Sequence, residues 1–205
     1  MTSSGDHYRT PAGQAEAQIK IERSLFVGIA IPLTGEEDFF ARLASIQKRY
    51  FDATHHCWAF RLFAIGGGRV RSSDAGEPGG TAGKPILSAI EAADLWDAGV
   101  VVVRYYGGVK LGTGGLGRAY REAAAAALAE TIIRDRYLYT RFTVMVPHAS
   151  ISAAFRLVDA PSVLLAHEEY GEVNEFSFDV RRSRADVFAA DLRARRLEFE
   201  RSQPL

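Results

Sequence analysis

The chain has 205 residues, 47% of them apolar, which suits one large or two small domains with packed cores. Its formal net charge of zero excludes a protein that coats nucleic acid through bulk positive charge, but it leaves room for a local basic patch. The single cysteine, Cys57, excludes an intrachain disulfide, and the lack of a signal peptide or a membrane-spanning run leads us to expect a cytoplasmic protein without membrane contact.

The first part of the chain predicts strands and helices, because β-branched and aromatic runs alternate with apolar residues at helical spacing. The polar residues 1–13 predict a loosely attached tail. We expect strands over 18–31, 56–63, 69–72 (after a glycine turn at 66–68) and 100–106. We expect helices over 35–50, where Thr34 and Glu37 form a capping-box pattern, over 85–98, which Gly99 would end, and over 116–131. The last of these is rich in alanine, which permits close approach to a sheet.

The remainder predicts a second domain after a charged connector at 134–136. With the boundary near 132–138, the domains are 14–131 and 138–205. We expect strands over 139–146, 163–169, 173–180 and 197–201. We expect helices over 151–158 and 184–196, the second capped by Ser183 with Asp186. The order β-α-β-β-α-β is that of a ferredoxin-like domain, and the predicted fold class is α+β.

Two glycine-rich segments, 73–87 and 104–120, each contain a lysine (Lys84 and Lys110) and each lead into a predicted helix. Glycine lets a ligand approach backbone N–H groups, and a helix N-terminus beside a lysine attracts anions. A single such glycine is more simply explained by a tight turn. Two such segments favour a binding surface, because glycine-rich loops of this length lose much conformational entropy when they are ordered. We expect Lys84 and Lys110 to converge on one positively charged hollow.

The predicted ligand is a phosphate or a nucleic-acid backbone, with arginines as forked donors. The predicted anion- or nucleic-acid-binding residues are Gly76, Glu77, Gly80, Thr81, Gly83, Lys84, Arg104, Tyr105, Gly107, Gly108, Lys110, Gly112, Thr113, Gly114, Gly115 and Arg118. Tyr105, Tyr106 and Tyr120 are candidates for stacking on bases, whereas Trp58 is assigned to the core.

Two familiar nucleotide motifs fail here. Residues 79–84 resemble a phosphate-binding Walker A loop, but the glycine spacing is one short and Pro85 replaces the magnesium-binding hydroxyl. Residues 112–117 match G-x-G-x-x-G, but they do not directly follow the strand and no second βαβ half is present. We therefore expect neither NTP hydrolysis nor NAD binding, and no cofactor.

Five reactive side chains lie near these segments. His55, His56 and Cys57 suggest a metal site or a nucleophile, but further zinc ligands are not near in the sequence. Asp74 and Glu77 could act as acid and base, or hold the loop by accepting N–H bonds. We favour structural roles for all five, and we expect no catalytic residue and no metal site.

The same residues resemble the signature of the Impact family, in its bacterial YigZ-like branch. The resemblance covers most of 18–128 and rests on residues 53–55, 57–60, 76–78, 80–87, 101–105, 107–116 and 118–120. Four positions depart from the family's usual residues, namely Ala75, Gly79, Gly117 and His56. The absence of an acid at Ala75 weakens any carboxylate-pair or metal chemistry in that loop.

The resemblance implies an N-terminal α/β sandwich like that of a ribosomal protein domain and of domain IV of elongation factor G, and a ferredoxin-like C-terminal domain. Eukaryotic relatives regulate translation through a stress-responsive kinase pathway. The first hypothesis is therefore a translation-associated regulatory protein that binds RNA, the ribosome or another phosphate-bearing ligand. The alternatives are an enzyme acting on a small phosphorylated or peptidic ligand through Asp74, Glu77, His55 or Cys57, and a protein-interaction module.

Overall fold

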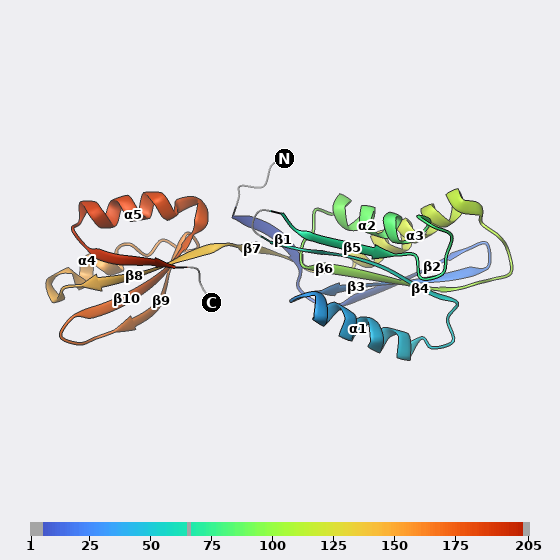
Figure 1. The fold of residues 1–205 in the computed structure, drawn as a ribbon, viewed down its shortest axis with the longest axis horizontal. Coiled ribbons are helices and arrows are strands. Elements are labelled where there is room, and N and C mark those ends of the chain that lie inside the picture. The colour runs from blue at the N-terminus through green and yellow to red at the C-terminus, as the bar shows by residue number, and fades with distance from the viewer. Residues whose placement is uncertain (1–5, 65–66, 203–205) are drawn as a thin grey trace. The chain divides into compact units, whose positions relative to one another are not determined.

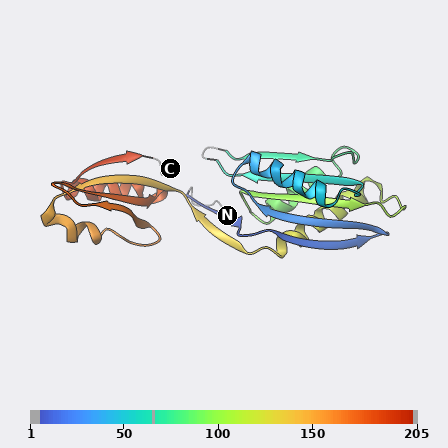
Figure 2. The ribbon, with the colours of Figure 1, turned by 90° about the horizontal axis from the view of Figure 1, so that it is seen from below.

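The computed structural model describes residues 6–64 and 67–202, so Gly66 of the predicted glycine turn lies outside the described residues. It divides into two compact units of mixed α/β structure. The larger unit comprises Arg9–Asp135, and the smaller one joins the chain up to Tyr8 with the chain from Arg136 onward. Figure 2 shows the large unit's strands running side by side, with one helix in front of the sheet and the others behind it.

The larger unit is built on a five-stranded antiparallel sheet with the strand order β2-β3-β6-β4-β5. These strands are β2 (Ala15–Ile21), β3 (Ser24–Pro32), β6 (Ala98–Tyr105), β4 (His55–Leu62) and β5 (Arg69–Ser73). The central strand β6 is buried on both faces, as its continuous β-branched run predicted.

Helices cover both faces of this sheet (Figure 1). They are α1 (Glu36–Arg49) on one face, and α2 (Gly83–Ala92) and α3 (Gly112–Ala129) on the other. Alternation along β6 places Val101 and Val103 in the core under α1, and Val100 and Val102 in the core under α2 and α3. Neighbouring residues of β6 therefore serve opposite sides of the sheet.

Helix α3 approaches strand β3 closely at Gly28. A Cβ atom on Gly28 would lie 2.2 Å from the carbonyl oxygen of Ala123, and the alanines of α3 that face the sheet are buried. The close approach expected from the alanine-rich sequence is confirmed.

The substitution Gly28→Ala is expected to destabilise the protein by about 1–3 kcal/mol or more, because the added methyl group meets backbone atoms that cannot rotate away. Urea unfolding measures the change. Gly13→Ala is the matched control, since a Cβ there has nothing within 4 Å. Equal stability of the two variants would contradict this packing.

The smaller unit contains a four-stranded antiparallel sheet with the order β11-β8-β10-β9. Its strands are β8 (Tyr139–Val146), β9 (Val163–Glu169), β10 (Asn174–Arg181) and β11 (Glu198–Ser202), and its α-helices are α4 (Ile151–Phe155) and α5 (Ala185–Ala194). Short 3-10 turns at His148–Ser150 and Arg182–Arg184 precede the two helices. Both helices pack on a core rich in phenylalanine, which includes Phe142, Phe176 and Phe178.

Three predicted segments differ in the structure. The β-like run over 18–31 belongs to two strands, joined by Glu22 and Arg23 at φ of 43° and 65°. The predicted tail and the predicted charged connector form strands β1 (His7–Pro11) and β7 (Ile133–Tyr137), which pair with each other. Their mutual hydrogen bonds, formed far apart in the sequence, override the local preference for loop.

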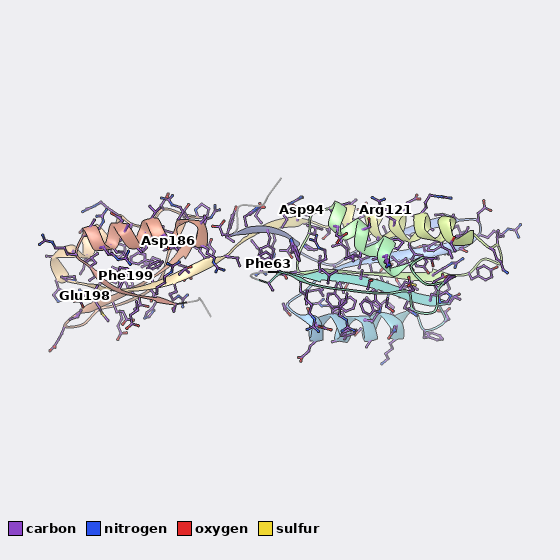
Figure 3. All side chains as sticks on the ribbon, turned by 45° about the horizontal axis from the view of Figure 1, so that its top comes forward. Phe63, Asp94, Arg121, Asp186, Glu198 and Phe199 are labelled. Carbon is purple, nitrogen blue, oxygen red and sulfur yellow. The ribbon has the colours of Figure 1, made fainter. Side chains whose placement is uncertain are left out.

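Predicted helix ends also need correction. Neither predicted cap forms: Gly35 is the N-cap of α1, and Ser183 instead donates from its N–H and hydroxyl to Asp6. Asp186, labelled on α5 in Figure 3, pairs with Arg201 at 2.8 Å. Helix α2 ends before Gly99, which lies inside β6.

Candidate anion-binding site

The first glycine-rich segment folds around the carboxylate of Asp74. Asp74 Oδ1 accepts the N–H groups of Ala82 (2.9 Å) and Gly83 (2.8 Å), and its Oδ2 accepts that of Gly80 (2.8 Å). Partial burial alone would raise the Asp74 pKa, but these N–H groups and the charge of Lys84 hold the pKa below its ordinary value. The N-terminus of α2 is therefore already neutralised by the chain's own carboxylate, and the loop-holding interpretation of Asp74 is confirmed.

The substitution Asp74→Asn is expected to cost about 1–3 kcal/mol of stability at neutral pH, since a neutral amide replaces a charged acceptor of three N–H groups. Because the folded pKa of Asp74 lies below its ordinary 3.8, its contribution is complete above that pH and is lost as pH falls below it. Chemical denaturation across pH measures this. A gap between wild type and variant that does not narrow in acid would contradict the assignment.

Glu77 is a buried acceptor that joins three elements. Its side chain is 4% exposed, and its Oε1 accepts from Arg104 Nη1 (2.5 Å) and from the Tyr120 hydroxyl (2.7 Å). His55 Nε2 lies 3.9 Å from the same oxygen, while His55 Nδ1 lies 3.0 Å from the carbonyl of Ala75. This network ties the first glycine-rich segment to β4, β6 and α3.

Arg104 lies beneath the surface. Its side chain is 6% exposed, and its guanidinium lies 5.3 Å from the ring centres of both Phe26 and Tyr106. Nη2 donates to Ser24 Oγ (3.4 Å), but the buried Nε has no hydrogen-bond partner among the described residues. Arg104 is thus an internal cation paired with Glu77, which differs from the free phosphate donor that we expected.

Cys57 and Tyr120 are buried beside this network. Cys57 Sγ donates to the carbonyl oxygen of Asp74 (2.9 Å), and burial raises the pKa of the Cys57 thiol to about 12. Burial, followed by the neighbouring Cys57 and Glu77, raises the pKa of Tyr120 far above its ordinary value. Cys57 is therefore a protonated thiol at neutral pH, and Tyr120, fully buried, is not accessible for base stacking.

The native protein is expected to resist alkylation of Cys57 by iodoacetamide near neutral pH, because the thiol is both buried and protonated. Mass spectrometry with and without guanidinium chloride measures the labelling. Labelling of the folded protein as fast as of the unfolded chain would restore the nucleophile hypothesis.

In the second glycine-rich segment the helix predicted over 116–131 begins four residues earlier than expected. Helix α3 begins at Gly112, with a φ of +67°, and its first turn is made of Gly112, Thr113, Gly114 and Gly115. Within this described stretch Leu111, the N-cap, makes no side-chain capping bond, and the first turn contains no acidic residue. Among the described residues, no side chain accepts an N–H group at this helix start, whereas Asp74 accepts two at the start of α2.

A hollow of about 350 Å³ opens beside this first turn. Its lining residues are Glu77, Pro78, Arg104, Tyr106, Lys110, Leu111, Gly112, Thr113 and Leu116. A second hollow of about 590 Å³ shares Lys110 and Leu111 and adds Gly115 and Arg118, with Glu22 and Glu122 also in its wall. Lys110 therefore borders both hollows at the start of α3.

The structure separates the predicted site residues into groups. Those in the walls of the two hollows are Glu77, Arg104, Lys110, Gly112, Thr113, Gly115 and Arg118. Those in the loop around Asp74 are Gly76, Gly80, Thr81, Gly83 and Lys84. Among the described residues that line the first hollow, Lys110 is present and Lys84 is not. Tyr105 packs on the α1 side of the sheet and donates to Asp52 (2.9 Å).

Sequence reasoning missed Ser24. Its Oγ accepts the N–H of Gly107 (3.2 Å) as well as Arg104 Nη2, and a Cβ on Gly107 would lie 2.2 Å from the backbone of Arg23. The sequence signal for this contact was Gly107, a glycine that lets two backbone segments approach closely. Its partner, Ser24, could not be identified because the turn at 22–23 was not predicted.

Among the described residues, no group of three or more His, Cys, Asp or Glu side chains is arranged to hold a metal ion. No helix in the described part of the chain is long and apolar enough to cross a membrane.

A family model, curated relatives and a solved structure all resemble this chain. Residues 22–128 match the family described as "Impact N-terminal domain". An "IMPACT family member" of Haemophilus influenzae is 43% identical over 126 residues, which is 59% of this chain and 59% of that protein, so the match spans less than two thirds of that relative. "IMPACT family member YigZ" of Escherichia coli is 31% identical over 161 residues, covering 78% of this chain and 79% of that one. A structure titled "Crystal structure of an hypothetical protein" has a TM-score of 0.66 at 26% identity, covering 98% of both chains.

Proposed function

The chain belongs to the Impact family, and on that basis we propose that it is a translation-associated regulatory protein that binds RNA phosphates, free or on the ribosome, at the first turn of α3. Regulation of translation is what the family resemblance implies, and a cytoplasmic location would accompany it. We also propose that the smaller unit has the ferredoxin-like fold. Its elements follow one another along the chain in the order β-α-β-β-α-β, and its strands form one antiparallel sheet in the order β11-β8-β10-β9. For the larger unit we propose the fold shared with domain IV of elongation factor G.

The observation that supports RNA binding most directly is the contrast between two helix N-termini. Asp74 accepts the N–H groups of Ala82 and Gly83 at the start of α2, whereas no described side chain accepts an N–H group from the first turn of α3. Backbone N–H groups at a helix start bind phosphate through hydrogen bonds and the helix dipole. Glycines there let a bulky phosphodiester approach the backbone.

Exposed cations lie on both sides of this turn. Lys110 precedes α3 and Arg118 lies on its second turn, and both are exposed. No ion pair that involves either of them occurs within the described part of the chain, so their charge is available to an anion. The exposed hydroxyl-bearing Thr113 adds a further donor in the first turn.

The enzyme alternative gains no support from the groups that it required. Asp74 caps α2, Oε1 of Glu77 accepts hydrogen bonds from Arg104 and Tyr120, and Cys57 is held as a buried thiol. These three side chains stabilise the loop instead of pointing free reactive groups at a substrate.

The double variant Lys110→Ala/Arg118→Ala is expected to weaken binding of a labelled single-stranded RNA at least ten-fold at low salt. It should also reduce the slope of log Kd against log salt by about 2, one for each lost phosphate contact. Fluorescence polarisation measures both, and co-sedimentation with purified ribosomes tests the larger ligand.

The matched control is Arg42→Ala/Lys48→Ala, which removes one arginine and one lysine from α1 on the opposite face of the sheet. It should bind like wild type. Equal losses in the two double variants, or no loss in either, would show that the α3 turn is not the binding surface.

A further inference from the structure

We infer that the hollow beside α3 takes one nucleoside phosphate, with its base stacked on Tyr106 and its phosphate at the first turn of α3. This inference rests on the proposed function and specifies the ligand of the same site. The shared chemistry is an aromatic base joined to a phosphate, either as a free nucleotide or as one unit of a single-stranded RNA.

Tyr106 supplies an aromatic surface at the wall of the hollow. It follows β6 directly, it lines the hollow, and it is 45% exposed. The guanidinium of Arg104 lies 5.3 Å from its ring centre, so a cation backs the ring from the protein side. An exposed ring of this kind is the platform on which single-stranded nucleic acids stack their bases.

The backbone around Tyr106 is held in place. The Tyr106 N–H donates to Thr54 Oγ1 (3.1 Å), and the N–H of the next residue, Gly107, donates to Ser24 Oγ (3.2 Å). Gly107 also packs so closely on Arg23 that a Cβ would not fit. A ring presented from such a fixed backbone loses little freedom when a base binds to it.

An unpaired buried donor also points to a ligand. Arg104 lines the hollow with its side chain 6% exposed, and its Nε has no partner among the described residues. A buried N–H without an acceptor is costly, so a small shift of the Arg104 side chain toward a ligand oxygen in the hollow would be favourable. The orphaned Nε is independent of the helix N-terminus, and Arg104 and the first turn of α3 both line the hollow.

The wall of the hollow combines the two kinds of chemistry that a nucleotide requires. Lys110, Gly112 and Thr113 contribute positive charge and polar groups, while Pro78 and Leu116 contribute apolar surface. A volume of about 350 Å³ is at the small end of ligand sites, which suits one nucleotide and excludes a duplex from the hollow. Recognition of an unpaired base by an aromatic side chain is the common mode for single-stranded RNA.

The test uses the full chain and three probes: adenosine 5′-monophosphate, ribose 5-phosphate and an eight-nucleotide oligoadenylate. We expect wild type to prefer adenosine 5′-monophosphate over ribose 5-phosphate, and Tyr106→Ala to abolish that preference. Tyr106→Ala should weaken oligoadenylate binding about ten-fold and leave ribose 5-phosphate unchanged. Tyr106→Phe, which keeps the ring, should behave like wild type.

Tyr170→Ala is the matched control, because Tyr170 is 56% exposed and lies in the smaller unit. Circular dichroism confirms that each variant is folded. Tighter binding of the oligonucleotide than of the mononucleotide assigns the site to RNA, and the reverse assigns it to a free nucleotide.

Equal affinity of wild type for the two monophosphates, or a base preference that survives in Tyr106→Ala, would overturn the nucleotide inference while phosphate binding at α3 stands. Failure of all three probes to bind would overturn the proposed function as well. The two failures are therefore distinguishable.

Discussion

The buried carboxylate of Glu77 is the interaction on which this end of the molecule depends. A carboxylate with 4% exposure is tolerable only when it is paired and hydrogen-bonded, and Arg104 and Tyr120 meet both needs. Because its partners lie on β6 and α3, the loop that contains Glu77 is fixed to the sheet and to the helix together. The wall of the hollow beside α3 consequently contains a buried ion pair, Glu77 with Arg104.

The two glycine-rich segments look alike in sequence but use their backbone donors differently. The first turns its N–H groups inward onto Asp74, so it is a self-contained cap for α2. The second runs directly into α3, with no side-chain cap in its described first turn, and it presents those groups beside exposed cations. In this chain the first segment therefore has a structural role, whereas the second leaves its backbone donors without a described side-chain acceptor.

The sequence predicted strands and helices best where buried residues recur at the regular spacing of a strand or a helix. The expected strands 139–146 and 163–169 agree with β8 and β9 to the residue, and the buried run of valines became the central strand β6. The predictions were wrong where distant partners decide. Strands β1 and β7 exist through their mutual pairing, and α3 begins within glycines that disfavour helix, one turn before its first buried residue, Leu116.

By itself, the sequence determined the family, the alternation of strands and helices, and the two segments in which a site had to be sought. Only the tertiary structure decided which donors are free. Glu77 contacts Arg104 and Tyr120, which lie 27 and 43 residues away along the chain. Tyr105, the last residue of β6, packs on the α1 side of the sheet, whereas the next residue, Tyr106, lines the hollow beside α3. Motif spacing specifies which residue types are present. Contacts between distant segments decide which partner neutralises a carboxylate and whether a helix N-terminus is capped.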